Sequence, residues 1–161
     1  MSANPATPDI GVNKEGRAKV GKELGKVLAD SYTLYLKTHN FHWNVKGPHF
    51  HALHNLFEEQ YTELAEAVDD IAERIRALGE TAPGSYRQFG NLNSIDEAPD
   101  TPPDALVMAD QLAQDHEAVA QTCRNLLPVA EGADDEVSVD MMIGRMTVHD
   151  KAAWMLRSIA A

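Results

Sequence analysis

Residues His42 to Glu73 read HWNVKGPHFHALHNLFEEQYTELAEAVDDIAE, and the part from His49 onward contains neither glycine nor proline. Such an uninterrupted stretch predicts one long helix, with Pro48 in its first turn. At about 3.6 residues per turn, positions 54, 58, 69 and 73 fall within roughly 100° of one another. One face of this helix therefore carries four possible metal ligands: His54, Glu58, Asp69 and Glu73.

These four side chains cannot meet on one ion within a single straight helix. Glu58 and Asp69 lie about 16 Å apart along its axis, whereas iron and zinc ligands sit about 2 Å from the metal. A second copy packed antiparallel about a two-fold axis near residues 63–64 removes the conflict, because His54 then faces Glu73 of that copy and Glu58 faces its Asp69. The spacing predicts two mixed histidine and carboxylate sites per dimer.

The preceding helix, expected at about 14–40, supplies a fifth candidate ligand. Its apolar residues recur at spacings of three and four, and continuing that stripe points His42 into the bundle near His54. A set of imidazole and carboxylate ligands that leaves coordination positions on the metal open is more typical of ferrous iron than of structural zinc, whose sites are closed. No histidine follows a glutamate by three residues, the spacing of single-chain di-iron bundles, so a site shared between subunits is favoured.

Length and composition favour a single all-helical domain. The chain has 161 residues, of which 43% are apolar, and we interpret residues 1–161 as one domain with a short flexible tail at about 1–13. Cys123 is the only cysteine, which excludes an intramolecular disulfide. The start MSANPATPDI lacks the features of a secretory signal, and no apolar run approaches the roughly 18 residues of a membrane span. We therefore expect a cytoplasmic protein.

The order of helices can also be predicted from breaks in the pattern. Four long helices are expected at about 14–40, 48–78, 104–129 and 137–159. The long connection at 80–103 carries Pro83 and Gly84, and we place a short helix in it at 94–98. One long crossover matches a ferritin-like four-helix bundle more closely than a simple up-and-down bundle.

Three blocks of the sequence resemble the Dps family, the mini-ferritins of starved bacteria. They are KTHNFHWNVKGPHFHALHNLFEEQYTELAEAVDDIAERIRALG at 37–79, PGSYRQF at 83–89 and HDKAAWMLR at 149–157. The resemblance implies a homo-dodecameric hollow shell with ferroxidase centres at its two-fold interfaces. It also implies oxidation of Fe(II) to Fe(III), preferentially by hydrogen peroxide, and storage of the ferric mineral, with zinc as a competitor for the site.

The resemblance assigns the same division of ligands as the spacing. His42, His54 and position 58 come from one subunit, and Asp69 and Glu73 come from its neighbour. The best-known members of the family carry Asp where this chain has Glu58, and the extra methylene favours bidentate or water-mediated binding. Trp43 resembles a tryptophan beside the family's iron site, where it intercepts oxidising equivalents or packs at the interface.

The other histidines are weaker candidates. His49 and His51 are interpreted as surface residues or auxiliary contacts, His39 as a hydrogen-bonding neighbour of the site, and His116 and His149 as structural residues. Trp154 is also interpreted as structural.

Five acids stand between residues 131 and 140 without a basic residue. Acids at the start of a helix complement its dipole and cap it. In the Dps family, however, this helix start lines three-fold pores, where repeated acids would draw cations inward. The best pore candidates are Asp135 and Asp140.

DNA binding is not favoured, although the family is known for it. The net charge is −11, and residues 1–20 hold three basic side chains against two acidic ones. Such a chain is expected to bind DNA only weakly at physiological salt. Two other interpretations stay open: a nucleoid-associated protein that compacts DNA, and a dimeric helical-bundle metalloenzyme. Either pair spaced by four residues, His54 with Glu58 or Asp69 with Glu73, would by itself also be typical of a solvated helix face.

Overall fold

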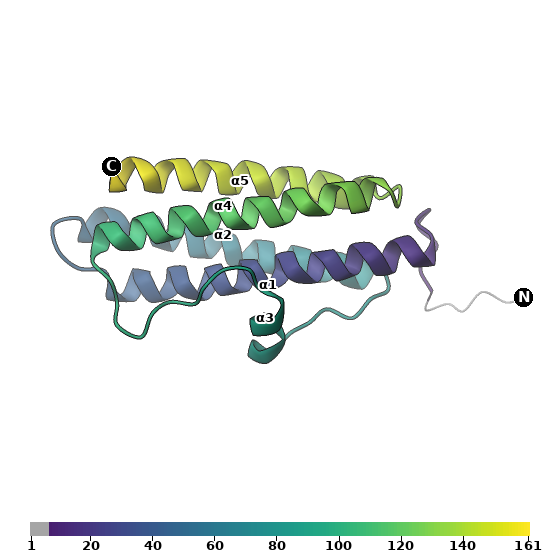
Figure 1. Cartoon of the computed structure of the whole chain (residues 1–161), viewed down its shortest axis with the longest axis horizontal. Helices are drawn as coiled ribbons and strands as arrows, with labels where there is room; N and C mark the ends of the chain where they lie inside the picture. The colour runs from purple at the N-terminus through teal and green to yellow at the C-terminus, as the bar shows by residue number, and fades with distance from the viewer. Residues whose placement is uncertain (1–6) are drawn as a thin grey trace, which may run out of the picture.

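The computed structural model describes residues 7–161, which form five helices and no strand. Their bounds are α1 (Lys14–Asn44), α2 (Phe50–Ala77), α3 (Tyr86–Leu92), α4 (Ala105–Glu131) and α5 (Glu136–Ala160). Figure 1 shows the four long helices running along the length of the molecule, with α3 outside the bundle beside α1. The predicted all-helical four-helix bundle with one long crossover is confirmed.

Short local sequences determine where the helices begin and end. Asn13 caps α1 by accepting a hydrogen bond from the Gly16 amide at 2.8 Å, which satisfies one of the amides that lacks a partner within the helix. Gly47 and Gly79 follow α1 and α2 with φ of 98° and 86°. Glycine adopts this left-handed conformation without the steric penalty of a Cβ, so Gly79 ends α2 directly after its cap Leu78. Helix α1 already ends at the extended residue Val45, and Gly47 turns the chain toward α2.

The sequence placed one helix end too early. Helix α1 continues to Asn44 rather than residue 40, and the Val45 amide still donates to the Phe41 carbonyl at 2.9 Å. The helix continues because the chain breaks only at Gly47 and Pro48. This extension puts His42 in the last turn of α1, where its position is fixed by the helix.

The short helix of the connection was predicted at the wrong place. It spans Tyr86–Leu92 and not residues 94–98, because Ser85 accepts a hydrogen bond from the Gln88 amide and starts a helix there. Residues 94–98 form no helix. Their polar groups bond to α1 instead, so the local helical bonds are not made.

Buried polar residues of α1 attach this connection to the bundle. Asp30 is fully buried and accepts hydrogen bonds from the Ser94 amide, the Ser94 hydroxyl and the Thr122 hydroxyl at 2.6 to 2.7 Å. Lys37 donates to the Asp96 carbonyl at 3.1 Å. A buried carboxylate is costly unless it is hydrogen-bonded, and these partners supply the compensation. The connection is therefore held against α1 and α4.

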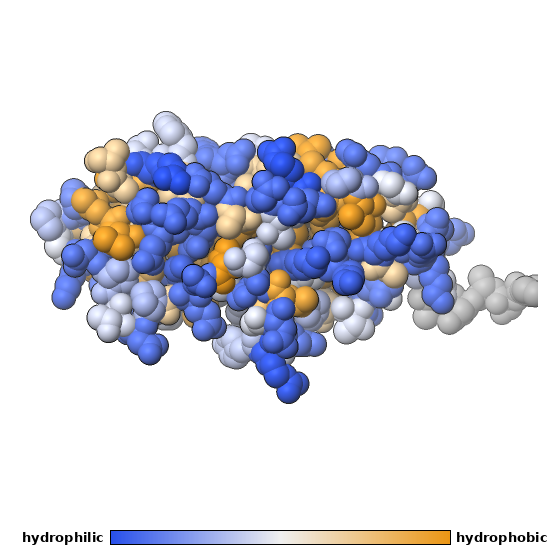
Figure 2. All heavy atoms as spheres, viewed as in Figure 1, coloured by the Kyte–Doolittle hydropathy of each residue, from blue (hydrophilic) through white to orange (hydrophobic). Residues whose placement is uncertain are grey.

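The hydrophobic core fixes how α2 is rotated about its own axis. Phe57, Leu64 and Ile71 recur every seven residues and are completely buried among side chains of the other long helices. Burying each such side chain stabilises the fold by about 1.5–3 kcal/mol. Since these residues face the core, Glu58 and Asp69 are left exposed on the other side of α2. Figure 2 shows that the visible surface is mostly hydrophilic, with separate hydrophobic patches.

The tail expected at residues 1–13 is described only in part, because residues 1–6 lie outside the described range. Within the described part, Val12 is buried, and its carbonyl accepts a hydrogen bond from the Arg17 guanidinium at 2.8 Å. Across residues 7–161, the helices lack the combination of length and apolar content that a membrane span requires.

Candidate metal centre

Two of the predicted ligands meet where α1 ends and α2 begins. The rings of His42 and His54 stack with their centroids 3.8 Å apart and their planes 17° apart. His42 is 8% exposed and His54 is partly buried. Two helices thus hold a pair of imidazoles at one place, as the sequence predicted.

Reciprocal hydrogen bonds orient both rings and place a proton on each Nδ1. The Nδ1 of His42 lies 2.8 Å from the His54 carbonyl, and the Nδ1 of His54 lies 2.8 Å from the His42 carbonyl. A carbonyl oxygen only accepts, so each Nδ1 carries the proton and donates it. In the tautomer that carries its proton on Nδ1, the lone pair lies on Nε2, and within residues 7–161 neither Nε2 makes a hydrogen bond. In metal-binding histidines, one ring nitrogen binds the metal while the N–H of the other donates to an acceptor that orients the ring. The Nδ1 hydrogen bonds of His42 and His54 are of this second kind.

The three predicted carboxylates lie on the exposed face of α2. Glu58 is one turn beyond His54, whereas Asp69 and Glu73 stand much further along the helix. In the described range, no three His, Cys, Asp or Glu side chains gather closely enough to hold a metal ion. One chain therefore carries two separate parts of the predicted ligand set, and the structure of one chain does not bring them together.

A family model for the ferritin-like domain matches residues 21–161. The DNA protection during starvation protein 2 of Bacillus anthracis is 40% identical over 137 residues, which cover 84% of this chain and 92% of that protein. The chain belongs to the Dps family. The resemblance noted in the three sequence blocks is thereby confirmed.

Solved Dps structures have the same fold. The Dps of Staphylococcus aureus superposes with a TM-score of 0.84 at 39% identity and covers 88% of this chain and 95% of its own. The Dps of Vibrio cholerae O1, described as a member of the ferritin-like diiron-carboxylate proteins, gives a TM-score of 0.91 at 29% identity and covers 99% and 100% of the two chains. The ferritin-like fold expected from the sequence is therefore confirmed for this Dps chain.

An aromatic cluster borders the histidine pair in this Dps chain. Trp43 is 59% exposed, and its ring centroid lies 3.9 Å from that of His39. On its other side, His39 stacks on Tyr61 at 4.2 Å, and Tyr61 meets His42 edge-on at 5.1 Å. His39 thus contacts the site by stacking, and in the described range its ring makes no hydrogen bond of the kind the sequence suggested.

The cluster also changes the acidity of its members. Burial and the neighbouring His42 lower the pKa of His39, so this ring stays neutral near pH 7. Burial, Glu58 and Tyr35 raise the pKa of Tyr61, which keeps the phenol protonated. Tyr61 was not among the site residues predicted from the sequence. Its contact with His42 depends on the crossing of α1 and α2, which no local sequence pattern reveals.

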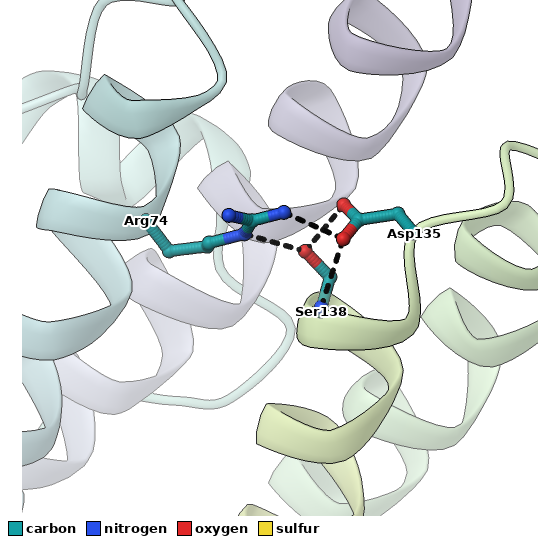
Figure 3. Close-up of polar contacts among 3 residues, drawn as sticks. All are labelled: Arg74, Asp135 and Ser138. Atoms are coloured by element: carbon teal, nitrogen blue, oxygen red, sulfur yellow. Dashed lines mark hydrogen bonds and ion pairs between the residues drawn. The ribbon is translucent and has the colours of Figure 1, made fainter. Parts of the chain in front are cut away.

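The two pore candidates of this Dps chain occupy different environments. Asp135 is 1% exposed, accepts hydrogen bonds from the amide and hydroxyl of Ser138, and pairs with the guanidinium of Arg74 (Figure 3). Asp135 therefore caps α5, which was the alternative to pore lining, and its ion pair links α5 to α2. In this arrangement its buried carboxylate is not available to a pore. Asp140 is exposed on α5.

The two histidines interpreted as structural lie in a buried polar network between α4 and α5. His149 Nε2 lies 3.1 Å from Arg145 Nη2, and the two Nδ1 atoms of His116 and His149 are 2.8 Å apart. Arginine only donates, so His149 is protonated on Nδ1 and donates to His116. Glu63 of α2 pairs with Arg145 and completes the network.

The remaining histidines are exposed. His49 precedes α2, and His51 accepts a hydrogen bond from the Asn55 amide group at 3.2 Å. Trp154 is 66% exposed on α5, so in one chain it is not a core residue.

Proposed function

We propose that this Dps-family chain is a ferroxidase that stores iron as a ferric mineral inside a dodecameric shell. The observation that supports this most strongly is the His42 and His54 pair, whose hydrogen bonds through Nδ1 leave both Nε2 atoms available, with Glu58 one helical turn further along α2. Neutral imidazole and carboxylate together are donors that suit ferrous iron.

The second half of the site comes from another copy. Asp69 and Glu73 are exposed and distant from the histidine pair of their own chain. An antiparallel packing of two α2 helices would place them opposite His54 and Glu58 of the partner, which gives two equivalent sites for each two-fold dimer. Carboxylates stabilise the ferric product, and the imidazoles keep affinity for ferrous iron.

Hydrogen peroxide is the oxidant that we propose for the reaction. Two ferrous ions give two electrons to one peroxide, and with two water molecules they form two FeO(OH) units and four protons. Delivering both electrons within one site avoids the release of hydroxyl radicals. Zinc binds the same donor types, so added Zn(II) should compete with iron and slow the reaction.

Two further residues extend the proposal. Trp43 lies beside His42 with an exposed ring, which suits interception of stray one-electron oxidants as well as packing at the interface. Asp140 is the exposed acid near the start of α5, and we propose that three copies of it line the entry pore for iron.

The experiment compares His54→Ala and Asp69→Ala with the wild type in anaerobic iron(II) loading followed by peroxide. Loss of a ligand should slow ferric formation at least about ten-fold while the helical content stays the same. The control is Asp70→Ala, since Asp70 is an exposed acid next to Asp69 but outside the predicted ligand face. Wild-type rates in both ligand variants would show that the site is assigned wrongly.

A further inference from the structure

A series of aromatic rings begins beside the histidine pair and follows α1 away from it. The ring centroid of Tyr61 on α2 lies 5.1 Å from that of His42. Tyr35 of α1 lies 6.2 Å from Tyr61, and Tyr32 lies 5.7 Å from Tyr35. The next ring is Phe89, which stacks on Tyr32 at 4.9 Å. Three of the four tyrosines of the chain therefore stand in one series that starts at the proposed iron site.

The order of the rings on α1 follows from helical spacing. Tyr32, Tyr35, His39 and Trp43 are separated by steps of three and four residues, so they share one face of the helix. On this face Trp43 meets His39 at 3.9 Å, and His39 meets Tyr61 at 4.2 Å. All these contacts are made within one chain, so a second copy packed against α2 would leave them in place.

The chemistry of these side chains allows an electron vacancy to move along the series. A tyrosine phenol that loses an electron also loses its proton, and the resulting phenoxyl radical can regain both from a neighbouring tyrosine. Tryptophan forms a radical in a comparable way, whereas phenylalanine is much harder to oxidise. The series of oxidisable rings on α1 therefore ends at Tyr32, where Phe89 follows.

We propose that Tyr61, Tyr35 and Tyr32 form a relay that draws one oxidising equivalent away from the histidine pair. The relay rests on the proposed ferroxidase function and serves the case in which a single ferrous ion meets a peroxide. One electron then comes from Fe(II), and the other comes from Tyr61, whose phenol also releases its proton. That proton and one from solvent convert the peroxide to two water molecules, so no hydroxyl radical is released.

The radical then passes from Tyr61 to Tyr35 and on to Tyr32, and each step restores the phenol behind it. A ferrous ion that arrives later returns an electron along the same rings, and Tyr32 regains a proton. The sum of these steps is two ferrous ions oxidised for one peroxide, as in the proposed reaction. The relay lets the two ions arrive one after the other.

An iron-free experiment on the intact assembled protein tests the relay itself. Tyr32→3-aminotyrosine places at the end of the series a phenol that is easier to oxidise and whose radical has its own absorption spectrum. A laser pulse ionises Trp43, and dissolved oxygen takes up the ejected electron. We expect the tryptophan radical to decay while the aminotyrosyl radical rises with a delay. Tyr35→Phe should abolish this delayed rise, because Tyr35 is the tyrosine that joins Tyr32 to Tyr61.

Matched controls use the other tryptophan and the remaining tyrosine of the chain. Trp43→Phe should remove the delayed rise, whereas Trp154→Phe should leave it unchanged because Trp154 lies on α5, apart from the series. Tyr86→Phe should also leave it unchanged, since Tyr86 begins α3 and is not one of the relay tyrosines. A delayed rise that survives Tyr35→Phe would overturn the relay, and so would the absence of any delayed rise.

A second measurement connects the relay to iron. The same aminotyrosine variant is mixed with one Fe(II) per site and with peroxide, frozen, and measured by EPR spectroscopy. An aminotyrosyl radical should appear, and Tyr61→Phe should remove it. A laser-driven rise without any EPR radical after iron and peroxide would overturn the role of the relay in iron oxidation. Loss of the laser-driven rise contradicts the relay alone, whereas a wild type that forms no ferric iron contradicts the proposed ferroxidase function.

Discussion

At the scale of single residues, hydrogen bonding to the backbone orients both rings of the histidine pair. Each ring of His42 and His54 donates to the main chain of the other residue and not to its side chain. Replacing one of them by alanine keeps the carbonyl that orients the other. A single substitution should therefore remove one ligand without disordering the second.

One prediction at this scale concerns Arg74, which pairs with the buried Asp135. Arg74→Ala leaves that carboxylate buried without its cation and should lower the free energy of unfolding by about 3 kcal/mol. Arg74→Lys keeps the charge and should recover part of the loss. Arg87→Ala, at an exposed position, should change stability by less than about 0.5 kcal/mol in the same urea titration. A small effect of Arg74→Ala would mean that Asp135 is solvated.

Side-chain roles were only partly predictable from the sequence. The inward direction of His42 followed from the three-and-four spacing of α1, and the meeting with His54 is confirmed. For Asp135, capping and pore lining were both compatible with an acid at a helix start. The choice depended on Arg74, which comes from a helix 61 residues away in sequence. Local pattern cannot report such a partner.

At the scale of helices, two buried neutral histidines, His116 of α4 and His149 of α5, form a hydrogen bond between these helices. Burial lowers the pKa of His116 to about 3 from a usual value of 6.5, and burial with the neighbouring His116 and Arg145 also lowers the pKa of His149. Both rings take up protons more readily in the unfolded chain. Above about pH 6.5 both rings are neutral in the folded and in the unfolded chain, so these two histidines add no pH dependence to the stability.

Stability should therefore fall as the pH drops from about 6.5 toward 3. The slope expected from each histidine is up to about 1.4 kcal/mol per pH unit. Denaturant unfolding between pH 4 and pH 7 checks this prediction, and His116→Gln should reduce the slope because one titrating group is gone. A stability that does not change over this pH range would contradict the buried neutral pair.

The helices themselves were well predicted, because long stretches without glycine or proline leave little choice. Helix α1 ran on to Asn44 because the chain breaks only at Gly47 and Pro48. The short helix formed at Tyr86–Leu92, where Ser85 caps it, and a tertiary contact with Asp30 holds Ser94 in the segment for which the helix was predicted. A buried aspartate on a distant helix gives no signal in the sequence around Ser94.

At the scale of the whole molecule, a chain with a net charge of −11 should behave as an iron store rather than as a DNA-compacting protein. We predict a native mass of twelve subunits and no tight complex with DNA at physiological salt in a mobility-shift titration. A stable dimer in native mass spectrometry would contradict the shell. Tight DNA complexes at that salt would instead favour a role in the nucleoid.

The central claim is that one active site is built from two copies of the chain, and co-assembly of two inactive variants tests it most directly. His54→Ala and Asp69→Ala subunits are unfolded, mixed in equal amounts, reassembled, and assayed for iron oxidation by peroxide. In a mixed dimer, one site contains both substitutions and the other contains neither. Random pairing makes about half of the dimers mixed, and each of these has one intact site of two, so about one quarter of the wild-type activity should return. If the mixture stays as inactive as either variant alone, the ligands do not come from different subunits.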